Sequence, residues 1–342
     1  MAPTIPTVPT VLSIPTVPTV LILGAAGRFG AAAVAAFAAA GWRVLAQQRR
    51  APTAPLARGT TVIHSTLDDT AALVTRAAGA DVVVYAVNPP YDRWDAELLP
   101  LFHQGLAVAQ GLGARFMLPG NVYNFGEQMP ALLTENTPQR PSTRKAHQRV
   151  AMETELQARA ATGLDSVVVR AGDFFGAGSG SWFDLAVVKN IRSGKLVYPG
   201  PLDLPHAWAY LPDLARAFVA VAGLPRQRGV QRLHFAGHTL TGRELLAAVD
   251  EAAAGLGLRP AKGFRHAGMP WWLIRAVGNV YPLWRELARM SYLWRVPHAL
   301  DGATLAKAVG VLPATPPVAA MRAALLELGL GSQRKTLPAA AV

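Results

Sequence analysis

Residues 19–50, TVLILGAAGRFGAAAVAAFAAAGWRVLAQQRR, decide the fold. The apolar run at 20–23 is typical of a strand buried on both faces, and three glycines follow it at the spacing GxxGxxG. An alanine-rich helical stretch then runs to Gly41, and a second apolar strand covers 44–46. In this context the glycines let the backbone approach a pyrophosphate, and the helix N-terminus offers it free N–H groups. The stretch therefore predicts a dinucleotide site.

Charge at the end of the second strand indicates which dinucleotide is bound. An NAD site usually has Asp or Glu there to bind the ribose 2′-hydroxyl, but Arg49 and Arg50 occupy this place. Guanidinium groups suit a 2′-phosphate, so the sequence predicts NADP, with NAD as the less favoured cofactor. The expected contacts in the loop itself are Gly24, Gly27, Arg28, Phe29 and Gly30.

Composition narrows the class of protein. A chain of 342 residues that is 51% hydrophobic and 16% charged can bury one large core or two modest ones. Cysteine is absent, which excludes disulfides and cysteine-ligated metal sites. The net charge of +12 comes from singly scattered basic residues without runs, so we expect no nucleic-acid partner. The eight histidines never fall in HxH or HExxH spacing, and no GxSxG occurs, so neither a metal site nor a serine nucleophile is predicted.

The first 18 residues repeat a Pro-Thr-Val theme, which favours extended geometry and predicts a flexible leader. They lack the basic start and uninterrupted apolar core of a signal peptide. No later stretch reaches the length of uncharged apolar residues that a transmembrane helix needs. We therefore expect a cytoplasmic protein without a transmembrane segment.

Apolar runs at 61–63, 81–87, 115–118 and 166–170 alternate with helical stretches at 67–76, 95–112 and 142–161. This alternation predicts an α/β fold, a Rossmann doubly wound parallel sheet over residues 19–175 with the 81–87 strand at its centre. Ligands bind beyond the carboxyl ends of such strands, so Val87 and Asn88 are expected beside the cofactor's ribose. Asp68, after the third strand, is expected either to bind the adenine amino group or, like Asp69, to cap the next helix.

Beyond the turn at Gly172 the alternation breaks, and residues 176–330 are expected to form a smaller C-terminal substrate lobe, with a tail at 331–342. A strand near 232–236 is expected to return, and 242–255 has a helical pattern. The segment 270–296 combines six aromatic residues with four arginines. It could line an apolar substrate pocket, pack as core, or rest on a membrane surface, and the sequence leaves all three open.

Four stretches together resemble a known family: GAAGRFG at 24–30, PGNVYNFG at 119–126, VVVRAGDFFG at 167–176 and WAYLPDLA at 208–215. From Val20 to about Gly329 the chain is similar to the extended and atypical short-chain dehydrogenases/reductases, the NAD(P)-dependent epimerase/dehydratase-like group. The resemblance implies a Rossmann domain with a smaller C-terminal substrate lobe. It also implies that Asp173 and Phe174 lie in the turn beside the nicotinamide.

The chain departs from this family in its catalytic residues. The family uses a serine or threonine, then a tyrosine with a lysine four residues on, but no YxxxK occurs here. Alignment on Glu153 places Lys145 at the tyrosine position and Arg149 at the lysine position, and Pro119 falls where the serine is expected. Proline cannot donate a hydrogen bond and arginine does not easily release a proton, so the usual triad is absent.

Other residues are candidates for the missing proton donor. Lys145 would serve if neighbouring arginines lower its pKa, and Tyr123 would serve with Asn121 polarising a carbonyl. His206 could face the substrate from the C-terminal lobe, and Arg149 is expected to contact the cofactor's ribose or phosphate. Each also has an ordinary explanation: a solvated helix face, a packed aromatic or a loop histidine.

These observations predict an NADP-dependent oxidoreductase, a monomer or homodimer. It would transfer a hydride to or from a small, partly apolar carbonyl, alcohol or activated alkene. One alternative is a nucleotide-sugar epimerase or dehydratase, which shows no net redox. Another is a non-catalytic NADP-sensing binding protein, which the missing triad favours.

Overall fold

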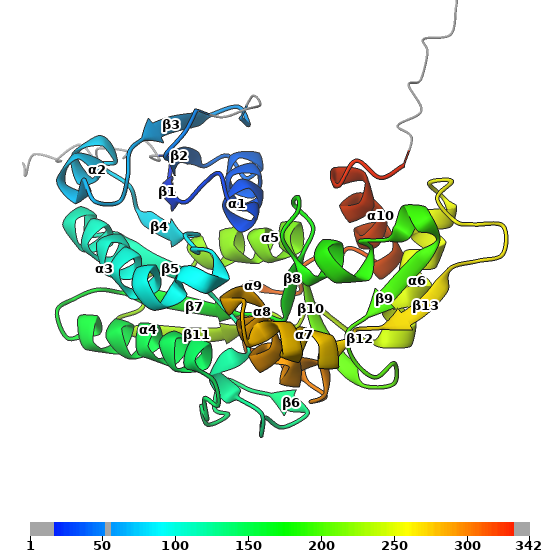
Figure 1. Cartoon of the computed structure of the whole chain (residues 1–342). Helices are drawn as coiled ribbons and strands as arrows, with labels where there is room; N and C mark the ends of the chain where they lie inside the picture. Colours follow the sequence, from blue (N-terminus) through cyan, green and yellow to red (C-terminus); the bar gives the residue numbers. More distant parts are fainter. Residues whose placement is uncertain (1–16, 52–55, 332–342) are drawn as a thin grey trace, which may run out of the picture.

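Seven parallel strands form the central sheet of the computed structural model, which describes residues 17–51 and 56–331. Most of the predicted leader, residues 1–16, and most of the predicted tail, residues 332–342, lie outside the described residues. The strand order is β11-β7-β5-β4-β1-β2-β3 (Figure 1). The bounds are β1 Thr19–Leu23, β2 Arg43–Gln48, β3 Thr60–His64, β4 Val82–Tyr85, β5 Arg115–Gly120, β7 Ser166–Arg170 and β11 Val230–His234.

Helices cover both faces of this sheet, because alternate residues of each strand point to opposite sides. In β1, Val20 and Ile22 join the core beneath α1 (Arg28–Ala39) and α5 (Leu211–Ala222). Leu21 and Leu23 join the core beneath α2 (Thr70–Arg76), α3 (Trp94–Leu112) and α4 (Arg144–Ala160). The predicted doubly wound Rossmann sheet is confirmed, with β4 at its centre.

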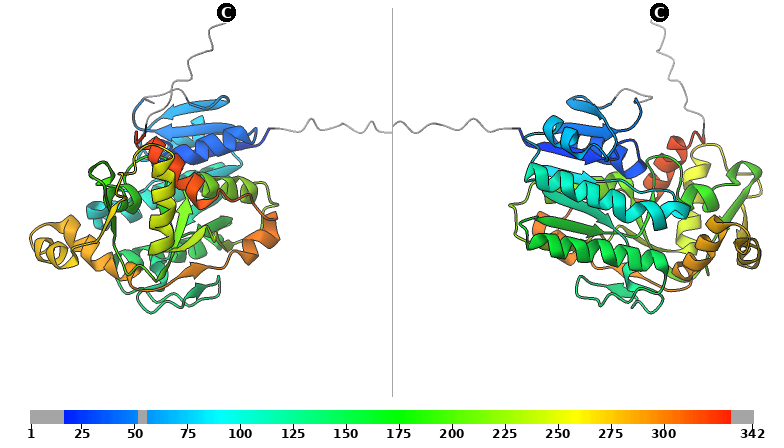
Figure 2. Two further views of the ribbon diagram at one scale, coloured as in Figure 1. Left: turned by 90° about the vertical axis from the view of Figure 1, so that its right-hand side faces the viewer. Right: turned by 60° about the vertical axis from the view of Figure 1, so that its left-hand side comes forward.

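A second group of elements packs beside the carboxyl ends of the central strands (Figures 1 and 2). Its three-stranded sheet has the order β12-β10-β8, and α6 packs on α10. Two further strand pairs are β9 with β13 and β6 with β14. The bounds are β6 Leu132–Leu133, β8 Asp173–Phe175, β9 Lys195–Tyr198, β10 Pro205–Tyr210, β12 His238–Thr241, β13 Arg265–Gly268, β14 Ala299–Leu300, α6 Gly242–Ala254, α7 Trp271–Gly278, α8 Pro282–Arg289, α9 Ala303–Val309 and α10 Pro317–Glu327.

Short helical turns complete the chain: η1 Tyr91–Arg93, η2 Tyr123–Phe125, η4 Ile191–Ser193, η5 Met290–Trp294 and the π-helical η3 Phe183–Val187. The main sheet recruits segments from beyond residue 175, because α5 packs on α1 and β11 pairs with β7. The division of the chain at residue 175 stays a prediction.

The aromatic segment 270–296 divides into two parts. Tyr292 and Trp294 are buried in the core, which is one of the three expected roles. Trp272 is exposed on α7, Tyr281 in the turn before α8, and Trp284 on α8. Within the described part of the chain, no helix has the length and apolar character needed to cross a bilayer.

Candidate active site

The glycine loop between β1 and α1 has the geometry that a pyrophosphate requires. Gly24 has a φ of +78°, which favours glycine, and a Cβ on Gly30 would lie 2.2 Å from the Gly24 carbonyl oxygen. Helix α1 begins after Gly27 without a side-chain cap, so the N–H groups of its first turn have no capping side chain. These residues fit a dinucleotide, because the loop can approach closely and the helix N-terminus is open.

Gln47 fixes this loop to the sheet. Its side-chain oxygen accepts a hydrogen bond from the Gly24 backbone N–H at 2.9 Å, and its amide group donates to the Ser65 carbonyl oxygen at 2.6 Å. The side chain is buried, so both bonds are shielded from water. Sequence reasoning missed this residue, because an uncharged side chain next to two arginines carries no signal of its own.

Three of the four arginines expected at the cofactor lie in or near the first two strands and differ in their settings. Arg49 and Arg50 are exposed directly after β2, as a 2′-phosphate site requires. Arg28 reaches across to the C-terminal part of the chain, where its Nη2 donates to the Gly180 carbonyl oxygen at 3.2 Å. Burial lowers the pKa of Arg28, and the carboxylates of Asp184 and Asp173 oppose this shift.

The end of β4 borders the glycine loop, and two acids expected near the cofactor follow β3. The Val87 side chain lies 3.0 Å from the position of a Cβ on Gly24, so it contacts the loop, and Asn88 beside it is exposed. Of the two acids after β3, Asp69 caps α2 by accepting from the Ala72 N–H at 3.2 Å. Asp68 instead accepts from the Gln104 side chain of α3 at 2.7 Å. The capping role therefore falls to Asp69.

Two tyrosine hydroxyls meet beyond β5. Tyr123 lies in η2, and its hydroxyl is hydrogen-bonded to that of Tyr91 in η1. Burial raises the pKa of Tyr123 well above its ordinary value, Tyr91 and Asp173 add to the rise, and Arg149 opposes it. Asn121 supports the turn, because its side-chain oxygen accepts from the Tyr123 N–H at 3.0 Å. The side-chain NH2 group of Asn121 is the part that could polarise a substrate carbonyl, and that role stays a prediction.

Helix α4 presents Lys145 and Arg149 from successive turns to one aromatic ring. The Lys145 ammonium lies 4.9 Å and the Arg149 guanidinium 5.0 Å from the centre of the Trp94 ring. The Lys145 ammonium donates to the Tyr91 carbonyl oxygen and lies 3.4 Å from the Glu286 carboxylate of α8. Burial lowers the pKa of Lys145, and Glu286 opposes this. Lys145 is 2% exposed, so it does not belong to a solvated helix face.

Arg149 extends toward the end of β5, where its Nη1 lies 3.5 Å from the Pro119 carbonyl oxygen. Burial lowers its pKa, and the nearby tyrosines, Tyr123 first, raise it. Because a guanidinium stays charged across the ordinary pH range, Arg149 brings a fixed positive charge to the two hydroxyls.

Asp173 and His206 form a second polar pair in this region. They are brought together by parallel pairing of β8 and β10, and His206 Nε2 donates to the Asp173 carboxylate at 2.9 Å. The His206 ring stacks on Trp294 at 4.4 Å, and His298 packs edge-on at 4.5 Å. Burial, helped by His206, lowers the pKa of His298 to about 3, so this ring is neutral. Phe174 follows Asp173 in β8 and packs 6.5 Å from Phe29 in the first turn of α1.

A buried ionic network fixes α4 behind these side chains. The Glu153 carboxylate accepts two hydrogen bonds from Arg170 of β7, at 3.0 and 2.6 Å, and one from Arg232 of β11, at 2.9 Å. The Asn124 amide of η2 donates to it at 3.0 Å. Burial would raise the pKa of Glu153, but the arginines outweigh burial and lower it. The network therefore locks α4 and η2 to the edge of the sheet.

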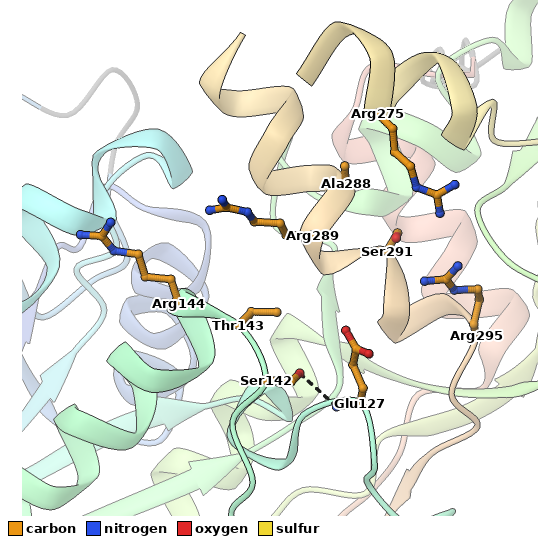
Figure 3. A pocket seen from close by; sticks show the side chains of 9 residues that line it. All are labelled: Glu127, Ser142, Thr143, Arg144, Arg275, Ala288, Arg289, Ser291 and Arg295. Carbon is orange, nitrogen blue, oxygen red and sulfur yellow. Dashed lines mark hydrogen bonds between the residues drawn. The ribbon is translucent and has the colours of Figure 1, made fainter. Parts of the chain in front are cut away.

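Two cavities lie where α4 begins beneath α8, and Figure 3 shows the residues that line the larger one. The larger has a volume of about 590 Å³, and four of its lining residues are arginines. Its lining residues are Glu127, Ser142, Thr143, Arg144, Arg275, Ala288, Arg289, Ser291 and Arg295. The smaller, about 210 Å³, is lined by Lys145 and Tyr91 and shares Arg144 and Arg289 with the larger. The larger cavity is polar, whereas the sequence suggested a partly apolar pocket, because the aromatic residues of 270–296 turn to the core or to solvent.

Solved structures with a similar fold are known, and three of them share less than 20% sequence identity with the chain. The enzyme WbmH of Bordetella bronchiseptica in complex with NAD+ has a TM-score of 0.69 and 19% identity, covering 91% of this chain and 98% of its own. The L-threonine dehydrogenase of Clostridium difficile has a TM-score of 0.68 and 16% identity, covering 92% and 98%. The UDP-glucose 4-epimerase of Thermotoga maritima with UDP-glucose has a TM-score of 0.69 and 14% identity, covering 90% and 98%. These similarities show a shared fold.

No curated protein sequence matches the chain significantly. The family model described as the NAD dependent epimerase/dehydratase family matches residues 20–234, which include the glycine loop, both tyrosines, Lys145, Arg149 and the Asp173–His206 pair. The match covers more than half of the chain and agrees with the resemblance in the sequence. The chain belongs to the NAD dependent epimerase/dehydratase family.

Proposed function

We propose that the chain is an NADP-dependent oxidoreductase that transfers a hydride between the cofactor and a carbonyl or alcohol group of a small substrate. The observation that carries this proposal is the hydrogen-bonded hydroxyl pair of Tyr123 and Tyr91 at the end of β5. Arg149 stands beside it at the position of the family's lysine. A tyrosine paired with a fixed cation is thus retained, although the tyrosine comes from η2 and the cation is an arginine.

The cofactor would be held by residues around the carboxyl ends of β1, β2 and β4. The loop Gly24–Gly30 and the N-terminus of α1 fit the pyrophosphate, and Val87 and Asn88 border the same loop. The exposed Arg49 and Arg50 fit a 2′-phosphate, which favours NADP. When bound, the nicotinamide supplies or accepts the hydride.

Tyr123 would donate the proton that the substrate oxygen needs after reduction. Burial and nearby negative groups raise its pKa, so the hydroxyl stays protonated at neutral pH. That state suits donation to an alkoxide better than removal of a proton from an alcohol, so we expect reduction to be the faster direction. Tyr91 stabilises the resulting tyrosinate through its own hydroxyl, and the charge of Arg149 does the same.

Lys145 would act on this pair through the backbone. Its ammonium group donates to the Tyr91 carbonyl oxygen, and Glu286 holds the ammonium from the other side. Lys145 therefore positions η1, while its lowered pKa keeps it a candidate donor in its own right. The Asp173–His206 pair is a further source of protons should the tyrosine pair not serve.

A second function is favoured by the larger cavity. Four arginines around about 590 Å³ suit an anionic substrate, and a sugar nucleotide carries a diphosphate. A nucleotide-sugar epimerase or dehydratase would use the same tyrosine pair but return the hydride to its substrate, so it would show no net cofactor oxidation.

The test is single-turnover NADPH oxidation with a panel of aldehydes, ketones and enones, followed by sugar nucleotides. Tyr123→Phe should slow turnover by about 10²–10⁴-fold, the range typical of a lost general acid, while NADPH affinity stays unchanged. Lys145→Met should slow it by a similar factor if lysine donates, and less if lysine only positions Tyr91. Tyr198→Phe is the matched control, since Tyr198 is a buried tyrosine of β9 that packs on Trp294.

Turnover that is unaffected by Tyr123→Phe and by Lys145→Met would remove both donors and leave the Asp173–His206 pair. Isomerised or dehydrated sugar nucleotide without NADPH consumption would favour the second function. Tight NADPH binding without any turnover on the full panel would favour a cofactor-sensing binding protein.

A further inference from the structure

Exposed apolar side chains are concentrated on one helical hairpin, residues 271–289, which comprises α7, α8 and the turn between them. Of ten large hydrophobic side chains that are exposed in the described chain, six lie in this α7–α8 hairpin: Trp272, Leu273, Val280, Tyr281, Leu283 and Trp284. Trp272 is 72% exposed and Val280 is 74% exposed. A clustered exposed apolar surface of this kind marks an interaction site rather than ordinary surface scatter.

The outward direction of these side chains follows from helix geometry. Trp272 and Ala276 are spaced by four residues in α7 and therefore lie on one face of the helix, and both are exposed. Val280 follows in the turn after α7 and is exposed as well. The opposite face carries Ile274 and Gly278, which are buried. A Cβ on Gly278 would lie 3.0 Å from the Arg285 Cα, so the two helices already pack closely at this point. The exposed apolar side chains of the hairpin therefore are not packed between its two helices.

The charged residues of the hairpin and the turn after it are mostly arginines. The segment 270–296 contains Arg275, Arg285, Arg289 and Arg295 against a single acid, Glu286. That acid is 16% exposed and pairs with Lys145 of α4 at 3.4 Å and with Arg289 of the hairpin at 2.8 Å. Arg275 and Arg295 make no ion pair with any residue in the ranges 17–51 and 56–331. The hairpin and the residues just after it therefore combine exposed tryptophan, tyrosine and aliphatic groups with two arginines, Arg275 and Arg295, whose charge no ion pair among the described residues compensates.

We propose that the α7–α8 hairpin docks this protein on the surface of a membrane that contains anionic lipids. Tryptophan and tyrosine favour the headgroup region, where the ring is in an apolar layer and its polar atom reaches water. Arginines near the surface are attracted to anionic headgroups, by about fivefold in affinity each. Each helix has eight residues and is about 12 Å long, so the hairpin lies on the bilayer rather than crossing it.

The position of the hairpin suits such a contact. In both views of Figure 2 the segment projects from the body of the molecule. Arg275, Ala288 and Arg289 of the same hairpin line the larger cavity, which therefore borders the docking surface (Figure 3). Docking would bring the mouth of this cavity close to the lipid headgroups. The proposal does not depend on which reaction the site catalyses.

The experiment is co-sedimentation of the purified full chain with vesicles of phosphatidylcholine alone or mixed with phosphatidylglycerol. We expect binding to the mixed vesicles and at least tenfold weaker binding to phosphatidylcholine alone, with the difference shrinking as salt screens the charges. The pair Trp272→Ser and Trp284→Ser should weaken binding at least tenfold on both vesicles. The pair Arg275→Gln and Arg295→Gln should remove only the preference for anionic lipid.

Two further variants keep the test sharp. Val280→Asp changes a turn residue that is 74% exposed and should weaken binding without affecting the fold, as circular dichroism would report. Val311→Ser, 92% exposed beyond α9, is the matched control and should bind like the wild type. Failure of the wild type to bind mixed vesicles, or equal binding by the tryptophan variant, would overturn the proposal. A concentration-dependent dimer abolished by the same tryptophan variant would also overturn it and assign the surface to a second copy of the chain.

Discussion

Replacing Glu153 by Gln should destabilise the protein more than any other single charge removal on α4. The Glu153 carboxylate is buried and receives hydrogen bonds from Arg170, Arg232 and Asn124. Removing one partner of a buried ion pair leaves the other charge uncompensated, which typically costs about 3–5 kcal/mol. Gln keeps the shape and one acceptor, so we expect a loss of about 3 kcal/mol in the free energy of unfolding.

The assay is urea unfolding of wild type and Glu153→Gln, followed by tryptophan fluorescence. Glu155→Gln is the matched control on the same helix, because Glu155 pairs with Arg159 at 2.7 Å on the partly exposed side. Such a helical pair contributes about 0.3–0.5 kcal/mol. Equal losses for the two variants would refute the argument that the network at Glu153 holds α4 in place.

The pH dependence of this loss has a defined sign. The folded-state pKa of Glu153 is lowered, so its contribution is complete above the unfolded-state pKa of about 4.3. It is lost as the pH falls through the lower folded-state value. The difference between wild type and Glu153→Gln should therefore be constant near neutral pH and shrink below about pH 4. A difference that grows in acid would contradict the assignment.

Three further predictions concern the cofactor and acid stability. Gly27→Asp should abolish NADPH binding in calorimetry yet leave a folded protein. The new Cβ would lie 3.3 Å from the Gly24 carbonyl oxygen, and the carboxylate would face the pyrophosphate. Unchanged affinity would exclude this loop as the site. Arg49→Ala with Arg50→Ala should weaken NADP by at least about tenfold and NAD little, since each charge-assisted bond contributes roughly 1.5–3 kcal/mol; equal losses would remove the 2′-phosphate assignment. Burial lowers the pKa of His298 from 6.5 to about 3, so between these pH values the unfolded chain binds a proton that the folded chain does not. The free energy of unfolding should therefore fall as the pH is lowered from 6.5 toward 3. His298→Gln should remove this part of the pH dependence, and an acid profile identical to that of the wild type would speak against the assignment.

The sequence predicted the main sheet well because its strands carry strong local signals. Val82–Tyr85 is a continuous β-branched and aromatic run, which only a strand buried on both faces accommodates. The glycine spacing predicted the first turn and the start of α1 for an equally local reason. The edge strand β11 was less predictable. It joins the sheet about 60 residues after β7, and its place depends on tertiary pairing with β7 rather than on a local pattern.

The candidate site was less predictable, because its key contacts join distant segments. Tyr123 was identified by its place after β5, but Tyr91 is 32 residues away and its hydroxyl contact leaves no pattern in the sequence. Glu286 meets Lys145 across 141 positions, and His298 meets His206 through a shared packing environment with Trp294. Such pairings follow from the tertiary packing of distant segments, which the periodicity of the sequence does not report.

The path of β11 and α5 also bears on how the chain acquires its shape during synthesis. Helix α1 ends at Ala39, and α5, which packs on it, begins at Leu211, roughly 170 residues later. At about 5–20 residues per second, the apolar side of α1 stays uncovered on the ribosome for about 10–35 s. The outer edge of β7 is free from its own emergence until β11 follows about 60 residues later. Until α5 and then β11 have been synthesised, the nascent chain therefore exposes apolar side chains and an unpaired strand edge, two features that make an incomplete chain prone to aggregation.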